Sequence, residues 1–188
     1  MEQSDLLHYV CTALESLGIK YLVTGSQATI VFGEPRFTND VAIVVALDLT
    51  HLDAFVRLFP EQDFYLSREA AREAIVERSM FNIIHPASGL KVAVMIPGSS
   101  LDEASRFDRG RSVQVAPDFA ATFASPEDVI RKKRECYKIG GSDKHLRDIS
   151  GVLKISGDKV DRAFVAKLAA QMGVAEIWQT ALDRAKNQ

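Results

Sequence analysis

The sequence predicts an α+β (α/β) protein in which a mixed sheet with flanking helices is followed by a C-terminal helical bundle. Short apolar runs bounded by turn residues fill the first 120 residues, and such runs are typical of buried strands. From Ser125 onward the spacing of apolar residues is helical throughout. We therefore expect residues 1–120 to form one domain and residues 121–188 to form a helical bundle packed on it.

The predicted strands are short and mostly apolar. They span residues 21–23, 41–47, 81–84, 90–96 and 113–115. The turn-prone stretch 85–89 joins two of them, so we expect a hairpin there. The run 41–47 is almost continuously apolar, which is typical of a strand covered on both faces.

Helical spacing predicts four helices among these strands. They span residues 4–17, 27–32, 49–59 and 68–75. Gly18 is a suitable C-cap for the first helix, and Gly33 with Pro35 ends the second, because glycine and proline interrupt helices.

A strong helix start opens the C-terminal part. In Ser125-Pro126-Glu127-Asp128, a serine cap, a proline at the first position and two acids all suit the unpaired amides and the helix dipole. The helices expected there span residues 126–138, 143–154, 158–171 and 173–186. They are separated by Gly140-Gly141, Ser156-Gly157 and Gly173.

Composition excludes few function classes. The chain has 188 residues and a net charge of −2, so nucleic-acid binding would require a local basic patch. It has no apolar run long enough to span a membrane, and its acidic start does not resemble a signal peptide, so we expect a cytoplasmic protein. Cys11 and Cys136 lie far apart, which favours reduced, half-buried thiols over a zinc site.

The segment 24–45 is the most informative part of the chain. Gly25 and Ser26 follow an apolar strand, and Arg36, Thr38 and Asp40 lead into the next one. Residues two apart on a strand share one face, so Asp40 and position 42 would point the same way. Paired carboxylates at that spacing would suit Mg²⁺, but Ala42 occupies the second position.

This segment resembles the active-site motif of the nucleotidyltransferase superfamily, the polymerase-β-like proteins. Its members carry Gly-Ser or Gly-Gly, then Asp-x-Asp, and a third acid in a later strand. That third position matches Ala93 in the run 91–96. The resemblance implies a site for Mg²⁺ or Mn²⁺ at Asp40 and at the acids expected at 42 and 93, with an NTP as substrate and the acid at 93 as base or ligand.

The two alanines allow three interpretations. Two aspartates replaced by alanine fit deliberate inactivation of an enzyme, because this change removes metal ligands and preserves a fold. A naturally degenerate binding protein is the second interpretation. In the third, the motif is misidentified: Ala42 and Ala93 belong to ordinary buried strands, and Asp40 is a turn residue.

Residues that could hold a nucleotide lie in two segments of the chain, and the first runs from Gly25 to Thr38. Gly25 lets the backbone approach a phosphate, and the Ser26 hydroxyl can donate to it. Arg36 has a fork suited to phosphate, although pairing with Glu34 or Asp40 explains it equally well. The motif places Thr38 with this group.

A second block makes the resemblance more specific. Glu127-Asp128, Lys133, the turn 137–144 and Asp148 are similar to a block found in bacterial nucleotidyltransferase-like proteins, including toxins of the abortive-infection and toxin–antitoxin type. The resemblance implies that Lys133 reaches the triphosphate and that Lys144 and Asp148 line the same cleft. Taken alone, the charge run 131–134 is typical of a solvated helix face.

The sequence therefore predicts an enzyme that moves an NMP from an NTP, for example ATP, onto a hydroxyl of RNA, tRNA or a protein. A toxin-like role with an antitoxin partner is favoured, and this chain is expected to be nearly inactive. If the acceptor is RNA, Arg106, Arg109 and Arg111 would supply phosphate contacts, although a solvated loop is the default interpretation of this segment. A catalytically silent nucleotide- or partner-binding module is one alternative. An aminoglycoside-type enzyme is the other, and it would need an acidic pocket, from Glu61, Asp63, Asp102, Glu103 and Asp108.

Overall fold

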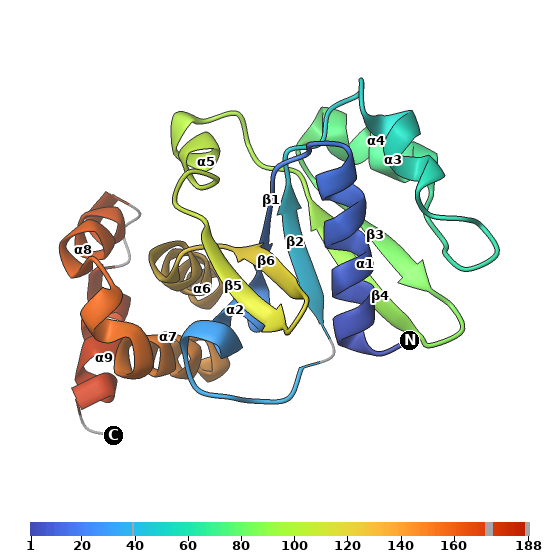
Figure 1. Cartoon of the computed structure of the whole chain (residues 1–188). Helices are drawn as coiled ribbons and strands as arrows, with labels where there is room; N and C mark the ends of the chain where they lie inside the picture. Colours follow the sequence, from blue (N-terminus) through green and yellow to red (C-terminus); the bar gives the residue numbers. More distant parts are fainter. Residues whose placement is uncertain (39, 172–174, 187–188) are drawn as a thin grey trace. The chain divides into compact units, whose positions relative to one another are not determined.

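The computed structural model describes residues 1–38, 40–171 and 175–186 (Figure 1). Its strands are β1 Tyr21–Thr24, β2 Val41–Val45, β3 Met80–His85, β4 Leu90–Met95, β5 Arg111–Ala116 and β6 Phe119–Phe123. Its α-helices are α1 Gln3–Ser16, α2 Gly25–Phe32, α3 Leu52–Arg57, α4 Arg68–Glu77, α5 Leu101–Ser105, α6 Pro126–Gly140, α7 Asp143–Ser156, α8 Arg162–Gln171 and α9 Ala175–Lys186.

The chain divides into two compact units. The first contains Met1–Thr24 and Asn39–Ala124, and the second contains Gly25–Thr38 and Ser125–Gln188. The sequence predicts a single division at residue 120. Residues 25–38 belong to the second unit because α2 packs against α6 and α7.

In the described residues, the first unit contains one mixed sheet of six strands, in the order β3-β4-β2-β1-β6-β5, together with α1, α3, α4 and α5. The pairs β2–β4 and β1–β6 are parallel, and the other neighbours are antiparallel. The predicted α+β class and the hairpin β3–β4 are confirmed.

The core of the first unit lies where α1 covers a face of the sheet (Figure 1). The apolar stripe of α1 includes Leu6, Val10 and Leu14, none of which is exposed to solvent. The phenylalanine-rich segment adds an aromatic cluster, in which the Phe55 and Phe59 rings lie 5.0 Å apart. On β2 and β4, Ile43 and Val92 are completely buried, whereas Ala42 and Ala93 are half-buried.

The second unit is helical, and its predicted caps are confirmed. The Ser125 hydroxyl accepts a hydrogen bond from the Asp128 amide at 3.2 Å, with Pro126 in the first turn of α6. Gly141 ends α6 in the left-handed conformation, with φ 63°. Buried Arg134 donates to the Val165 carbonyl at 3.2 Å and lies 5.5 Å from the Trp178 ring, and burial lowers its pKa to about 10.

Several predicted boundaries are wrong, each for a local reason. The helix expected at 49–59 is shorter and spans Leu52–Arg57. The Asp48 carboxylate accepts hydrogen bonds from the backbone amides of Thr50 and His51, and these bonds stabilise a turn before the helix. The helix expected from residue 158 begins at Arg162, after a 3₁₀ turn at Gly157–Lys159. The sequence did not predict α5 or β6. The separator Gly173 lies outside the described residues.

Both cysteines are free thiols, and they differ in burial. Cys11 is buried and Cys136 is half-buried. Burial raises the pKa of Cys11 to about 12; the Tyr21 hydrogen bond lowers it and the Glu15 charge raises it. A thiol with so high a pKa is a poor nucleophile, because the thiolate is the reactive form.

We therefore expect iodoacetamide at pH 8 to modify Cys136 and to leave Cys11 unmodified in the folded protein. Mass spectrometry of tryptic peptides measures both sites, and the variant Cys136→Ser is expected to take up almost no reagent until denaturant is added. Native-state modification of Cys11 at the rate of Cys136 would contradict the structure.

Candidate active site

A row of four residues crosses the sheet of the first unit at the predicted metal site. In the parallel pair β2–β4, Ala42 lies opposite Ala93. Thr24 of β1 lies opposite Ala42 on one side, and Asn82 of β3 lies opposite Ala93 on the other. The two alanines that the motif singles out are therefore direct neighbours across strands.

This row, which we call the sheet row (Thr24, Ala42, Ala93 and Asn82), lies on the less buried face. Ala42 and Ala93 are half-buried, whereas the adjacent Ile43 and Val92 point to the opposite face and are completely buried. Asp40 is exposed and lies two positions before Ala42, just outside β2. The structure brings positions 42 and 93 together on one face, and Asp40 comes directly before the strand that carries Ala42.

The side chains present do not fit a divalent metal ion. A Mg²⁺ ion takes oxygen ligands in near-octahedral geometry, and the methyl groups of Ala42 and Ala93 offer none. Asp40 is the carboxylate beside the row, with the Asn82 amide and the Thr24 hydroxyl as further oxygens. In residues 1–38, 40–171 and 175–186, no three His, Cys, Asp or Glu side chains gather as a metal site.

The Gly-Ser turn has the backbone that its sequence predicts. Gly25 has φ +64°, a conformation that residues with a Cβ rarely adopt, and it begins α2 directly after the last residue of β1. The Thr29 hydroxyl donates to the Gly25 carbonyl at 2.8 Å, which steadies the first turn of α2. Ser26 lies in that turn.

Four predicted residues meet in the second unit; we call them the Arg36 cluster (Ser26, Arg36, Lys133 and Asp148). Arg36 donates through Nε to Asp148 Oδ1 at 3.0 Å and through Nη2 to Oδ2 at 3.2 Å. Its Nη2 also donates to the Ser26 hydroxyl at 2.8 Å. Lys133 Nζ donates to Asp148 Oδ2 at 2.6 Å.

The cluster is charged and largely withdrawn from water. The side chains of Lys133 and Asp148 are 9% and 4% exposed, and that of Arg36 is 25% exposed. Burial alone would raise the pKa of Asp148, but the hydrogen bonds from Lys133 and Arg36 outweigh it and leave the pKa below its usual value. Asp148 is therefore ionised at neutral pH, between two cations.

Contacts between α2 and α7 hold Arg36 near Asp148. A Cβ on Gly33 would lie 2.9 Å from the Val152 amide nitrogen, so the two backbones touch there. Just beyond, Lys154 Nζ donates to Glu34 at 3.0 Å. Glu34 thus pairs with Lys154, and Arg36 pairs with Asp148 instead of Glu34, which the sequence had suggested.

The charge run 131–134 is not a solvated face. Arg131, Lys133 and Arg134 are all buried, and Lys132 is the exposed member, paired with Glu135 at 2.9 Å. The interpretation of this run as a solvated face is therefore wrong, since three of the four cations in the run are buried in the second unit.

The remaining predicted residues are less enclosed. Lys144 is exposed in the first turn of α7, and Thr38 is half-buried. Residue 39 of the motif lies outside the described residues.

Sequence reasoning missed Asn82 and Arg147, and it noted His145 only as a neighbour of Lys144 near the expected cleft. Asn82 adjoins Ala93, and its polar side chain between apolar residues of β3 was the available signal. His145 is half-buried; burial lowers its pKa below the usual value, and the charge of Lys133 lowers it further. Exposed Arg147 lines a hollow of about 210 Å³ with Arg36 and Asp148.

Comparisons with known proteins identify the fold. No protein-family profile and no curated protein matches the chain. Solved structures do match: an antigenic nucleotidyltransferase-like protein from Paracoccidioides brasiliensis shares 20% identity and a TM-score of 0.55, covering 81% of this chain and 75% of that one. The antibiotic-resistance factor ANT(2'')-Ia with adenylyl-2''-tobramycin has 10% identity and a TM-score of 0.61, covering 90% and 98%.

The fold is that of the nucleotidyltransferases. The lincosamide antibiotic adenylyltransferase LnuA with bound lincomycin agrees, with 13% identity and a TM-score of 0.52 over 79% of this chain and 95% of that one. The predicted mixed sheet of this fold is thereby confirmed.

On this nucleotidyltransferase fold, the loop charges expected to contact an acceptor are paired with one another. Arg106 donates to Glu103 at 2.8 Å, and Arg106 is buried. Arg109 lies 3.7 Å from Asp102. These pairs weaken both the basic path for RNA and the acidic pocket for a polycation.

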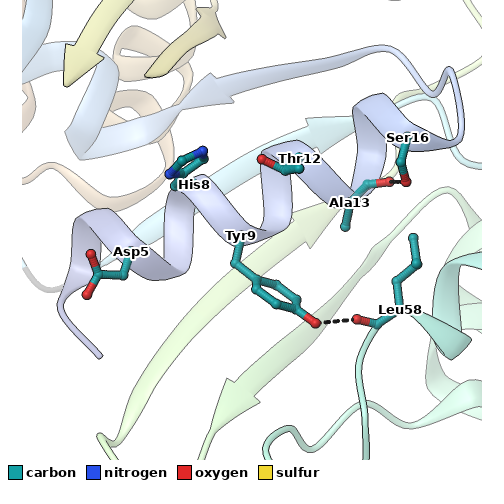
Figure 2. A pocket seen from close by; sticks show the side chains of 7 residues that line it. All are labelled: Asp5, His8, Tyr9, Thr12, Ala13, Ser16 and Leu58. Atoms are coloured by element: carbon teal, nitrogen blue, oxygen red, sulfur yellow. Dashed lines mark hydrogen bonds between the residues drawn. The ribbon is translucent and has the colours of Figure 1, made fainter. Parts of the chain in front are cut away.

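A separate hollow of about 440 Å³ lies along the outer side of α1 (Figure 2). Asp5, His8 and Thr12 line it from successive turns, and Figure 2 shows Tyr9 reaching to Leu58, whose carbonyl accepts the Tyr9 hydroxyl at 2.7 Å. It contains no residue of the predicted motifs. None of the described helices is both long and apolar enough to cross a membrane.

Proposed function

We propose that this chain is the inactivated form of a metal-dependent nucleotidyltransferase, an enzyme that moves an NMP from an NTP onto an acceptor hydroxyl. The observation that supports the proposal best is the register of the sheet row. Ala42 and Ala93 are direct partners on parallel strands, beside Asp40, in a nucleotidyltransferase fold. Two alanines at these two positions fit the loss of two metal ligands.

The residues of each unit would have distinct tasks. In the parent enzyme, Asp40 and aspartates in place of Ala42 and Ala93 would hold Mg²⁺ or Mn²⁺, which offsets charge on the triphosphate and activates the acceptor hydroxyl. In the second unit, Arg36 and Lys133 would bind phosphate by charge-assisted hydrogen bonds. Ser26 and the backbone at Gly25 add donors at the start of α2.

The acceptor we favour is RNA, tRNA or a protein, in a toxin-like cytoplasmic role with an antitoxin partner. A toxic enzyme gives a reason for an inactive form to exist. Thr38 and Lys144 belong to this proposal as residues near the nucleotide, with Lys144 exposed at the start of α7.

The test is an incubation of α-³²P-labelled NTPs and Mg²⁺ with the variant Ala42→Asp/Ala93→Asp and with the unchanged chain. Total RNA, a cell extract, an aminoglycoside and a lincosamide are offered as separate acceptors. We expect label on RNA or protein with the variant alone. No label from either protein would overturn the proposal in favour of a silent nucleotide- or partner-binding module.

Transfer to an antibiotic is the second candidate. Two of the similar structures are antibiotic-bound or antibiotic-resistance proteins, and they cover most of this chain. Against this candidate, Asp102 and Glu103 pair with arginines and Asp108 lies 3.8 Å from Lys20, so these acids are partly neutralised. Label on the antibiotic in the same assay would decide for it.

A further inference from the structure

Asp148 is the common acceptor for both cations of the Arg36 cluster, half-buried Arg36 and buried Lys133. One carboxylate oxygen takes Arg36 Nε, and the other takes Arg36 Nη2 and Lys133 Nζ, at distances of 2.6–3.2 Å. Its side chain is 4% exposed. A carboxylate in this position does not bind a phosphate, because both are anions.

The geometry leaves donors of both cations for another anion. Asp148 accepts from Nε and Nη2 on one edge of the Arg36 guanidinium, and among the described residues Nη1 donates at 3.4 Å to the Phe37 carbonyl alone. Lys133 has three N–H groups, and one of them is used by Asp148. The hydrogen bonds to Asp148 fix the direction of both side chains and leave other N–H groups of Arg36 and Lys133 able to donate to a phosphate.

Resting on the proposed function, we infer that Asp148 is a positioning residue, which holds Arg36 and Lys133 in place to bind the phosphate groups of a nucleotide and does not touch the nucleotide itself. Preorganised donors bind more tightly because the ligand does not have to order them. Arg36 and Lys133 carry long side chains with several rotatable bonds, and the two residues are 97 positions apart in the sequence. Asp148 is the group that both of them contact.

Two other roles predict different results. If Asp148 were an anion that phosphate displaces, removing its charge would strengthen phosphate binding, since the cluster would become more positive. If Asp148 were a counterion for stability alone, its loss would lower the melting temperature, and phosphate affinity in the folded protein would stay unchanged. A positioning residue predicts weaker binding in spite of the greater positive charge.

The probe is inorganic tripolyphosphate in EDTA, titrated calorimetrically into the full chain, so that the result does not depend on the missing carboxylates. We expect Asp148→Asn to weaken binding by about tenfold. Asp148→Glu keeps the charge and displaces it by one methylene, so we expect a loss of several-fold. The control Glu176→Gln removes an exposed charge from α9 in the same unit, outside the predicted motifs, and its affinity is expected to stay within about twofold of the unchanged chain.

The two proposals fail in different ways. If the unchanged chain and Lys133→Gln bind tripolyphosphate equally, the phosphate site itself is absent, and both proposals are overturned. If Lys133→Gln loses binding while Asp148→Asn and Asp148→Glu bind as well as the unchanged chain, only the positioning role is overturned. Should Asp148→Asn not fold, Asp148→Glu decides alone, because it retains the counterion.

Discussion

Replacing Ala42 and Ala93 together by aspartate is expected to create a divalent metal site and to raise nucleotidyl transfer by about 10³-fold or more. Neighbouring strands lie about 4.8 Å apart, so carboxylates at register partners reach one ion. A metal that offsets developing charge contributes several kcal/mol, and each 1.4 kcal/mol is about tenfold in rate. Mn²⁺ binding, followed by electron paramagnetic resonance, measures the first step.

The control for this prediction is Ala42→Asn/Ala93→Asn, which adds nearly the same volume without charge. The single variants Ala42→Asp and Ala93→Asp are expected to bind Mn²⁺ weakly, because each gives only two carboxylates with Asp40. Equal Mn²⁺ affinity of the Asn and Asp double variants would contradict the metal site, and so would a double Asp variant that binds Mn²⁺ only as the single variants do.

The parts of the fold that could be predicted are those set by local signals. The apolar runs of β2 and β4 and the Ser125 cap of α6 gave nearly correct elements, because burial and capping act within a few residues. Strand β6 was missed because its alternation is carried by two alanines and a threonine between Phe119 and Phe123. Its inward residues become apolar core only once β1 and β5 lie on either side.

The candidate site divides in the same way. Strand periodicity alone predicts that positions 40 and 42 share a face. Ala93 was added to this site by the resemblance, and in the structure it is the register partner of Ala42 on a parallel strand. The contact of Arg36 with Asp148 joins residues 112 apart in the sequence, and local patterns hold no information about such a pair. The sequence suggested Glu34 or Asp40 as the partner of Arg36, and tertiary packing selects Asp148 instead.

Replacing Gly33 by alanine is expected to destabilise the second unit by about 1–3 kcal/mol, because overpacking forces a backbone to shift. The added Cβ would lie 2.9 Å from both the Thr29 carbonyl oxygen and the Val152 amide nitrogen. Gly151→Ala is expected to have a smaller effect, since its Cβ would lie 3.2 Å from the Glu34 nitrogen. Chemical denaturation followed by circular dichroism measures both.

Gly140→Ala is the matched control. Nothing lies within 4 Å of a Cβ at this position, which is also helical, so alanine there is expected to be neutral or to stabilise the protein by up to about 1 kcal/mol. A Gly33→Ala variant as stable as Gly140→Ala would show that α2 and α7 do not approach so closely.

Gly33 also leads directly into the segment that carries Arg36, so the backbone shift is expected to weaken tripolyphosphate binding as well. Gly140→Ala, at the far end of α6, should leave that binding unchanged.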